Sequence, residues 1–318
     1  MRNESPNPGA TLLAERFAPE TLGGAPILEL AARLWEPDRY EAFRACYRAM
    51  RLVDDLVDDS RSGGRLACET EKAAIRREVV RCMLDDGDPG LHIVHLREVR
   101  ERFAIPRWPW ERWTRAMLYD VDHDGFPSFR EYLRYAEGAA VAPGAIFLHL
   151  CGLRRENGGY RPPAFDIRRT ARPLAIFCYL VHIMRDFRTD QLEDLNYFPD
   201  RLLAVHGLTR RDLRAIARSG EIPPAFRRLL GEYRAIAGFY GRRARAAVDG
   251  VADLLGDRYR ASLEVVYALY HQVFERIRPH TGALTAEEFL PTGDEMRLRL
   301  EAILAGLEAE ADGRRAET

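Results

Sequence analysis

Apolar side chains recur every three to four positions along most of this 318-residue chain, which is the spacing of helices that bury one face. The pattern predicts helices over residues 26–36, 38–59, 65–86, 110–120, 128–151, 168–194, 209–219, 223–248, 251–278 and 293–310. No segment shows convincing strand alternation, and breakers such as Ser62-Gly63-Gly64 and Pro223-Pro224 fall between the helices. We therefore predict one all-α domain over residues 1–318, frayed at 1–12 and 309–318.

Composition narrows the class of protein. Hydrophobic residues make up 47% of the chain, which is enough for a sizeable core. The 48 basic and 49 acidic residues balance, so no overall charge draws the protein to nucleic acid. The five cysteines show neither disulfide nor zinc spacing, and residues 1–20 lack the apolar segment of a signal peptide. We expect a cytoplasmic protein with no nucleic-acid partner.

Four aspartates crowd into residues 51–59, RLVDDLVDD, on an otherwise half-buried helix. Residues four apart share a helical face, so Asp54 and Asp58 point the same way, with Arg51 just before them. Two carboxylates at the rim of a core repel each other unless a cation neutralises them, and Mg²⁺ is a hard cation that takes such oxygen ligands. The alternative is a solvated acidic face, which is common for a single pair.

A second pair follows the apolar stretch 174–184. Asp186 and Asp190 repeat the same spacing, Arg185 precedes them, and Asp194 is expected one step further along the same face. Two such helices are stronger evidence than one. Facing aspartate pairs can hold Mg²⁺ around a diphosphate while arginines stabilise its departing charge.

Two longer segments resemble the squalene/phytoene synthase family, the head-to-head prenyl synthases. They are YRAMRLVDDLVDD (47–59) and MRDFRTDQLEDLNYFP (184–199), and the likeness extends over roughly residues 26–290. Tyr135 in YAEGAAVAPG and Tyr270 in ALYHQVFERIR resemble two further family tyrosines. The resemblance implies an all-α isoprenoid-synthase bundle with a central active-site cavity.

The resemblance also implies roles for particular residues. Asp54, Asp58, Asp186 and Asp190 would hold Mg²⁺ that bridges diphosphate oxygens. Arg51, Arg185, Tyr47 and Tyr270 would contact the diphosphate, and Tyr135 would lie near the reacting carbons. Loss of diphosphate from an allylic substrate leaves a carbocation, which water would quench, so the site needs an apolar channel. The candidate residues lining this channel are Ile146, Phe147, Leu150, Phe177, Leu180 and Val181.

The chain departs from the family at several positions. The family's Gln and Asn, seven and four residues before the second aspartate pair, are replaced by Tyr179 and His182. We expect Tyr179 to contact substrate, and His182 either to contact diphosphate or move a proton, or to pack between helices. Pro143 should disturb the helix in AAVAPG, and the family's N-terminal diphosphate element is not visible in 20–36.

A competing motif lies in residues 120–131, DVDHDGFPSFRE. Asp120, Asp122, Asp124, Gly125 and Glu131 match the calcium loop of an EF-hand. The motif stands alone, however, and Pro127 occupies a position that normally holds an aliphatic residue. We interpret it as an acidic turn between helices.

Three functions stay open at this stage. The first is Mg²⁺-dependent head-to-head coupling of two farnesyl or geranylgeranyl diphosphates. The second is a terpene cyclase, or a prenyltransferase to another acceptor, on the same fold. The third is a non-catalytic or calcium-responsive scaffold. The need for NADPH, the oligomeric state and peripheral contact with the inner face of a membrane are not fixed by the sequence.

Overall fold

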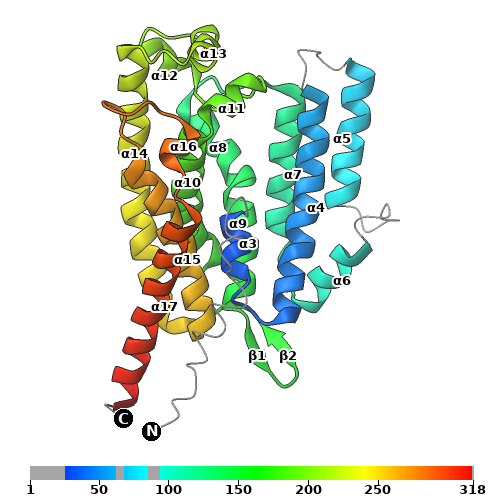
Figure 1. The fold of residues 1–318 in the computed structure, drawn as a ribbon. Helices are drawn as coiled ribbons and strands as arrows, with labels where there is room; N and C mark the ends of the chain where they lie inside the picture. Colours follow the sequence, from blue (N-terminus) through cyan, green and yellow to red (C-terminus); the bar gives the residue numbers. More distant parts are fainter. Residues whose placement is uncertain (1–25, 62–67, 85–93, 317–318) are drawn as a thin grey trace.

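The computed structural model describes residues 26–61, 68–84 and 94–316, and these form a bundle of helices (Figure 1). The first part of the chain contains α3 (Ile27–Ala32), α4 (Pro37–Arg61), α5 (Glu69–Met83), α6 (Val94–Arg102), α7 (Arg107–Asp122), α8 (Phe129–Ala139) and α9 (Val141–Gly152). The second part contains α10 (Ile167–Arg185), α11 (Phe187–Leu192), α12 (Asp200–Val205), α13 (Arg210–Ser219), α14 (Pro224–Asp249), the short 3-10 helix η2 (Ala252–Leu254), α15 (Asp257–Arg276), α16 (Ala286–Phe289) and α17 (Gly293–Ala316).

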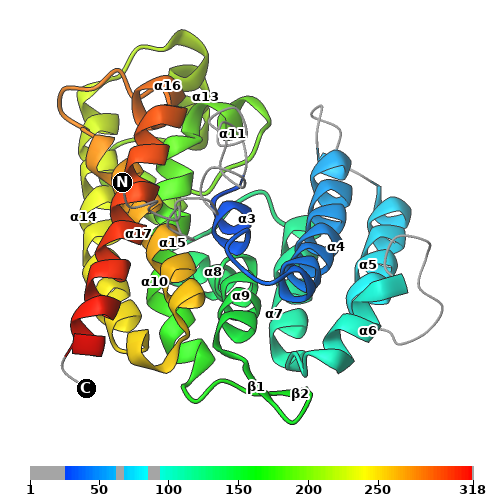
Figure 2. The ribbon, with the colours of Figure 1, turned by 60° about the horizontal axis from the view of Figure 1, so that its bottom comes forward.

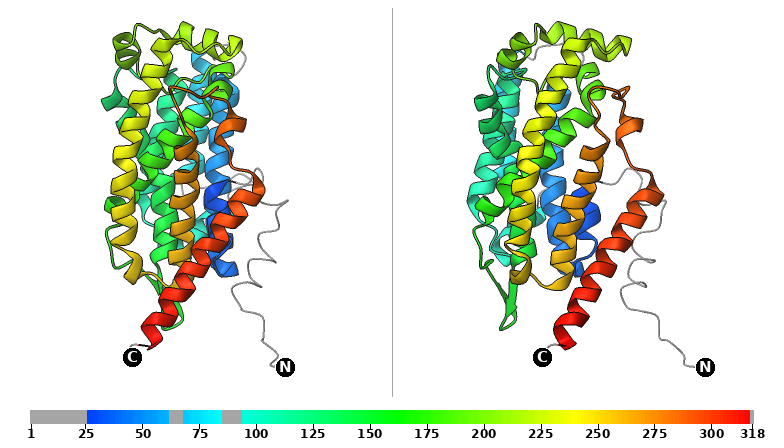
Figure 3. Two further views of the ribbon diagram at one scale, coloured as in Figure 1. Left: turned by 60° about the vertical axis from the view of Figure 1, so that its left-hand side comes forward. Right: turned by 90° about the vertical axis from the view of Figure 1, so that its left-hand side faces the viewer.

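The long helices form two groups with a third set between them. Helices α4 to α7 lie on one side, and α10, α14, α15 and α17 lie on the other (Figure 2). Helices α3, α8 and α9 lie between these groups, and α9 contacts α4, α7, α10 and α15. The short helices α11 to α13 lie across one end of the bundle (Figure 3). The predicted all-α architecture is therefore confirmed.

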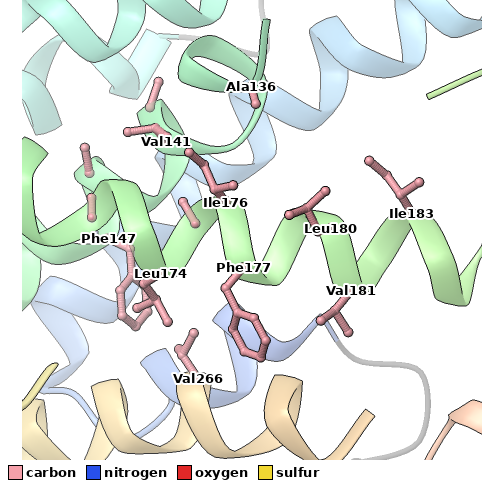
Figure 4. Close-up of a cluster of buried hydrophobic side chains, with 14 of the residues drawn as sticks. Ala136, Val141, Phe147, Leu174, Ile176, Phe177, Leu180, Val181, Ile183 and Val266 are labelled. Atoms are coloured by element: carbon pink, nitrogen blue, oxygen red, sulfur yellow. The ribbon is translucent and has the colours of Figure 1, made fainter. Parts of the chain in front are cut away.

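Helix α10 is the centre of the second group and packs against α8, α9, α14 and α15. Its first turn is capped by Asp166, whose carboxylate accepts from the Arg169 amide at 2.9 Å. Phe177 points toward Val266 of α15, whereas Ile176 and Leu180 point to the opposite side (Figure 4). Burial on both sides fixes the rotation of α10 about its axis, and thereby the direction in which its polar residues point.

Two predicted helices are each divided. Residues 128–151 form α8 and α9, which separate at Ala140. Pro143 lies in the first turn of α9, just after this break, where its missing N–H is tolerated. Residues 168–194 form α10 and α11, which separate at Asp186 with φ −96° and ψ 8°. Asp194 lies beyond α11 with φ 60° and pairs with Arg214, so it does not continue the aspartate face.

A β-hairpin that was not predicted from the sequence lies at the end of the bundle opposite α11–α13 (Figure 1). Strands β1 (Arg154–Glu156) and β2 (Gly159–Arg161) pair antiparallel through a turn at Asn157 and Gly158, which have φ 50° and 79°. Asn-Gly is the favoured pair for such a turn, and this signal was overlooked. Tyr160 stacks on Phe103 at 4.8 Å between ring centroids and donates to Asp38 at 2.5 Å, which fastens the hairpin to α4 and α6.

Further boundaries differ from those predicted. Helices α6, α12 and α16 were not expected, and α17 continues to Ala316 through residues that were expected to be frayed. Residues 1–12, which were predicted to be frayed, lie outside the described residues. Residues 65–67 and 85–86 of the predicted helix 65–86 lie outside them too. Among the described helices, none is both long and apolar enough to cross a bilayer.

The close contact between α7 and α8 can be tested by a substitution at Gly138. A Cβ added to Gly138 would lie 2.2 Å from the Arg112 carbonyl oxygen and 2.7 Å from the Ala116 Cβ. We expect Gly138→Ala to force the helices apart and lower the free energy of unfolding by about 2–3 kcal/mol in urea denaturation. The control is Gly306→Ala in α17, where a Cβ meets nothing within 4 Å and should stabilise the helix by about 0.5–1 kcal/mol. Equal stability of Gly138→Ala and the wild type would contradict the observed contact.

Candidate active site

A cavity of about 200 Å³ lies between α4, the α8–α9 junction, α10 and α15. Six of the residues predicted from separate parts of the sequence line it: Tyr47, Arg51, Phe147, Tyr179, His182 and Tyr270. Much of the remaining wall is made of small residues from α8–α10: Ala139, Ala140, Pro143, Gly144, Ala171 and Ala175. The cavity is therefore mainly apolar, with polar side chains from α4, α10 and α15.

Helix α4 places the first aspartate pair. Val53 and Val57 are 0% and 1% exposed and anchor the helix against the core. Arg51 donates to Asp54 and to Asp55, each at 2.8 Å. Burial, reinforced by the like charge of Asp58, raises the pKa of Asp54 to about 7 despite Arg51. The negative charge of this pair is thus only partly compensated within the protein.

The second pair lies where α10 passes into α11. Two hydrogen bonds of 2.6 Å join the Arg185 guanidinium to Asp186. Burial opposes ionisation of Asp186, but the Arg185 bonds and the neighbouring His182 outweigh it and lower the pKa of that carboxyl. Asp190 has no such partner for its Oδ2, which is buried without a hydrogen bond. Burial, then the charges of Asp186 and Glu193, raise the pKa of Asp190 to about 8.

The two pairs influence each other from opposite sides of the site. Asp58 on α4 adds to the upward shift in the pKa of Asp190 on α11. Burial, and then a set of aspartates that includes Asp190, Asp58 and Asp54, raise the pKa of Tyr197 well above its usual value. Both pairs therefore lie at the same end of the bundle, near α11 (Figure 1). No three carboxylate, histidine or cysteine side chains in the described ranges converge on one point, because Asp54 and Asp186 turn toward their arginines.

His182 connects the second pair to the cavity. Its Nδ1 lies 2.9 Å from an Arg185 amino group, which can only donate, and its Nε2 lies 3.2 Å from Asp186. These partners assign the neutral ring with a proton on Nε2. Burial, followed by the positive charges of Arg185 and Arg51, lowers the pKa of His182 to about 4 despite Asp186. His182 thus lines the cavity as a neutral ring that donates to Asp186.

None of the four aspartates lines this cavity, and neither do three further predicted site residues, Arg185, Phe177 and Tyr135. Arg185 lies behind His182 and Asp186. Phe177 is 0% exposed and packs against Phe274 and Tyr267 in the core. Figure 4 shows its ring pointing toward Val266 of α15. Tyr135 lines a second cavity, of about 240 Å³, between α7 and α8.

The other residues predicted to line the channel also differ in whether they reach the cavity. Phe147 lines the cavity, whereas Ile146, Leu150, Leu180 and Val181 are buried in the core away from it. Helical periodicity marks these residues as apolar but does not say which apolar face meets a cavity. The small residues of the wall, together with Met50, Trp113 and Cys178, were missed for the same reason.

The EF-hand-like segment does not form a calcium loop. Its acidic side chains turn to separate partners: Asp120 to Tyr135, Asp122 to Arg76, and Glu131 to Ser128. Asp124 accepts from Arg210 at 2.6 Å, and Arg210 also binds Asp200. A Cβ on Gly125 would lie 2.9 Å from the Arg210 guanidinium carbon, so this glycine makes room for the arginine. The segment is an acidic turn held by arginines from α5 and α13.

The chain matches the squalene/phytoene synthase family over residues 28–298. It is similar in structure to a dehydrosqualene synthase in complex with a ligand (15% identity, TM-score 0.65), covering 96% of this chain and 98% of that one.

Two further structures are similar along nearly their full length. They are squalene synthase HpnC from Alicyclobacillus acidocaldarius (16% identity, TM-score 0.58, 95% of each chain) and YisP from Bacillus subtilis subsp. subtilis strain 168 (15%, 0.58, 94% of this chain and 100% of that one). No curated protein sequence matches the chain. The family match covers most of the chain, and the protein therefore belongs to the squalene/phytoene synthase family.

Proposed function

We propose that this protein is a Mg²⁺-dependent prenyltransferase that couples two allylic prenyl diphosphates head-to-head and releases diphosphate. The observation that carries the proposal is that two aspartate pairs, each next to an arginine, adjoin an apolar cavity through Arg51 and His182, which line it and contact Asp54 and Asp186. This arrangement separates a charged region for the diphosphate from an apolar region for the hydrocarbon chain.

The four aspartates fit a magnesium site in their chemistry. Asp54, Asp58, Asp186 and Asp190 offer carboxylate oxygens, and the buried Asp190 Oδ2 has no partner within the protein. Burial and then neighbouring carboxylates raise the pKa values of Asp54 and Asp190, and a bound cation would favour their ionised forms. When bound, Mg²⁺ would neutralise the diphosphate and make it a better leaving group.

The protein's own side chains would bind and orient the substrate. Arg51 lines the cavity and holds Asp54, while Arg185 holds Asp186 from behind, and both would donate to diphosphate oxygens. Tyr47 and Tyr270 line the cavity beside them and can donate further hydrogen bonds. The apolar wall formed by Phe147, Leu174 and their neighbours would keep water from the allylic cation.

The alternative is a reaction of one prenyl diphosphate, either by cyclisation or by transfer to another acceptor. The cavity volume of about 200 Å³ favours it, because ligand pockets generally measure ~300–1,000 Å³ and two prenyl chains need more space than one. The bulky Tyr179 in the cavity wall, where the family usually has Gln, points the same way.

Product analysis tests the proposal. The purified protein is incubated with farnesyl diphosphate and Mg²⁺, with and without NADPH, and then with geranylgeranyl diphosphate. We expect diphosphate release and a product with two prenyl units, whose hydrogen count shows whether reduction occurred. Asp54→Ala and Asp186→Ala should each slow release by roughly 100-fold or more.

Each other result has a distinct meaning. A product with one prenyl unit would establish the alternative. No diphosphate release with any prenyl diphosphate would overturn the enzymatic proposal altogether.

The pKa shifts predict how pH affects the metal-free protein. Folding raises the pKa values of Asp54 and Asp190 from 3.8 to about 7 and about 8. At pH values between 3.8 and about 8, the folded state therefore binds more protons than the unfolded state. Stability should therefore be greatest at low pH in this window and should fall as the pH rises toward 8. Thermal unfolding with a chelator, at pH 5.5 and pH 8, measures this.

Removing one charge separates this effect from other titrations. Asp190→Asn should raise the unfolding free energy of the metal-free protein at pH 8 by about 1–3 kcal/mol and weaken its stabilisation by Mg²⁺ with inorganic diphosphate. Asp253→Asn, at an exposed position in η2, is the matched control and should change neither. A destabilised Asp190→Asn variant would show that Asp190 is compensated within the protein.

A further inference from the structure

Asp120 is a buried carboxylate next to the proposed active site, and the calcium-like pattern does not explain it. It lies near the end of α7 and is 8% exposed, whereas Asp122 and Asp124 of the same segment lie at the surface and pair with arginines. The Tyr135 hydroxyl donates to its Oδ2 at 2.6 Å. A buried carboxylate carries a desolvation cost, so its position beside Tyr135 calls for a function.

Tyr135 connects Asp120 to the main cavity through a second tyrosine. The side chains of Tyr135 and Tyr179 are neighbours, with ring centroids 6.5 Å apart. Tyr179 lines the main cavity, and Tyr135 lines the groove between α7 and α8. A continuous path therefore runs from the cavity through Tyr179 and Tyr135 to Asp120.

We propose that Tyr179, Tyr135 and Asp120 form a relay that takes up the proton lost when the carbocation is quenched. The inference rests on the proposed function. When an allylic cation forms a carbon–carbon bond with an alkene, the positive charge moves to a neighbouring carbon. That charge is neutralised when an adjacent C–H bond breaks and its electron pair closes the new ring or double bond.

The proton moves by three linked transfers. Tyr179 oxygen accepts it from carbon and gives its own hydroxyl proton to Tyr135, and Tyr135 gives its proton to the Asp120 carboxylate. Both tyrosines end as they began, and Asp120 ends protonated. The groove that Tyr135 lines then offers a route by which the proton reaches solvent.

The surroundings suit tyrosines that transfer protons without ionising. Burial, reinforced by neighbouring charges that include Asp120, raises the pKa of both Tyr135 and Tyr179 well above the usual value. Tyrosinate is thus disfavoured, and the carboxyl group is the better final acceptor. His182 is less suited as the base, because its Nδ1 accepts from Arg185 and its Nε2 faces Asp186.

Product partition tests the relay separately from ionisation. Asp120→Asn, Tyr135→Phe and Tyr179→Phe are assayed with farnesyl diphosphate and Mg²⁺ for diphosphate release and, by mass spectrometry, for products. In each we expect the fraction of proton-loss product per diphosphate released to fall at least threefold, with water-captured alcohols increasing. Because the ratio counts only completed turnovers, a smaller folded fraction would not change it.

Two variants serve as controls. Tyr132 belongs to the same cluster, with its ring stacked 5.9 Å from Tyr179, but its buried hydroxyl has no hydrogen-bond partner. Tyr132→Phe should therefore keep the wild-type product ratio, and so should Asp253→Asn, which repeats the Asp-to-Asn change at the surface.

The outcomes distinguish this inference from the proposed function. An active wild type whose product ratio is unchanged in Asp120→Asn would overturn the relay and indicate another base, such as the departing diphosphate. A wild type that yields only alcohol would overturn it too. If the wild type releases no diphosphate from any prenyl diphosphate, the proposed function fails and the relay with it.

Discussion

The repulsion among buried carboxylates is the constraint on which the site depends. Asp54, Asp58, Asp186 and Asp190 lie at one end of an apolar bundle, where water screens their charges poorly. The protein compensates them unequally. Arg185 binds Asp186 through two hydrogen bonds and lowers its pKa, whereas Asp190 one turn later keeps a raised pKa and an oxygen without a partner. A cation bound there would favour the ionised form of Asp190 and supply a partner for this oxygen.

The fold positions this charge through the packing of two helices that are far apart in the sequence. Val53 and Val57 fix the rotation of α4, while Phe177 and Leu180 fix that of α10. The change of direction at Asp186 ends α10 without breaking the hydrogen bond from the Asp190 amide to the Asp186 carbonyl, which is 3.0 Å long. The second aspartate pair therefore keeps its helical spacing although Asp186 lies between α10 and α11 and Asp190 lies within α11.

Much of this arrangement could be predicted from local sequence, and the rest depends on contacts between distant segments. The four-residue spacing of the aspartates is set by helix geometry, so their pairing was predictable. Asp194 breaks that pattern because its backbone has a positive φ, which the spacing alone does not reveal. Likewise, Phe147 and Phe177 look equivalent in sequence. The packing of α14 and α15 against α10 encloses Phe177 in the core, whereas Phe147 on α9 lines the cavity.

The acidic turn at 120–131 and the aspartate pairs show how one residue type serves different ends. Asp122 and Asp124 are near the surface, where arginines from distant helices neutralise them permanently at little desolvation cost. Asp190 is more enclosed, and its Oδ2 is left without a partner. Asp120 is enclosed too, but it accepts a hydrogen bond from a neutral hydroxyl. Burial and the nature of the partner, rather than the spacing of the carboxylates, therefore determine whether an aspartate in this protein holds the fold together, suits a metal ion or can receive a proton.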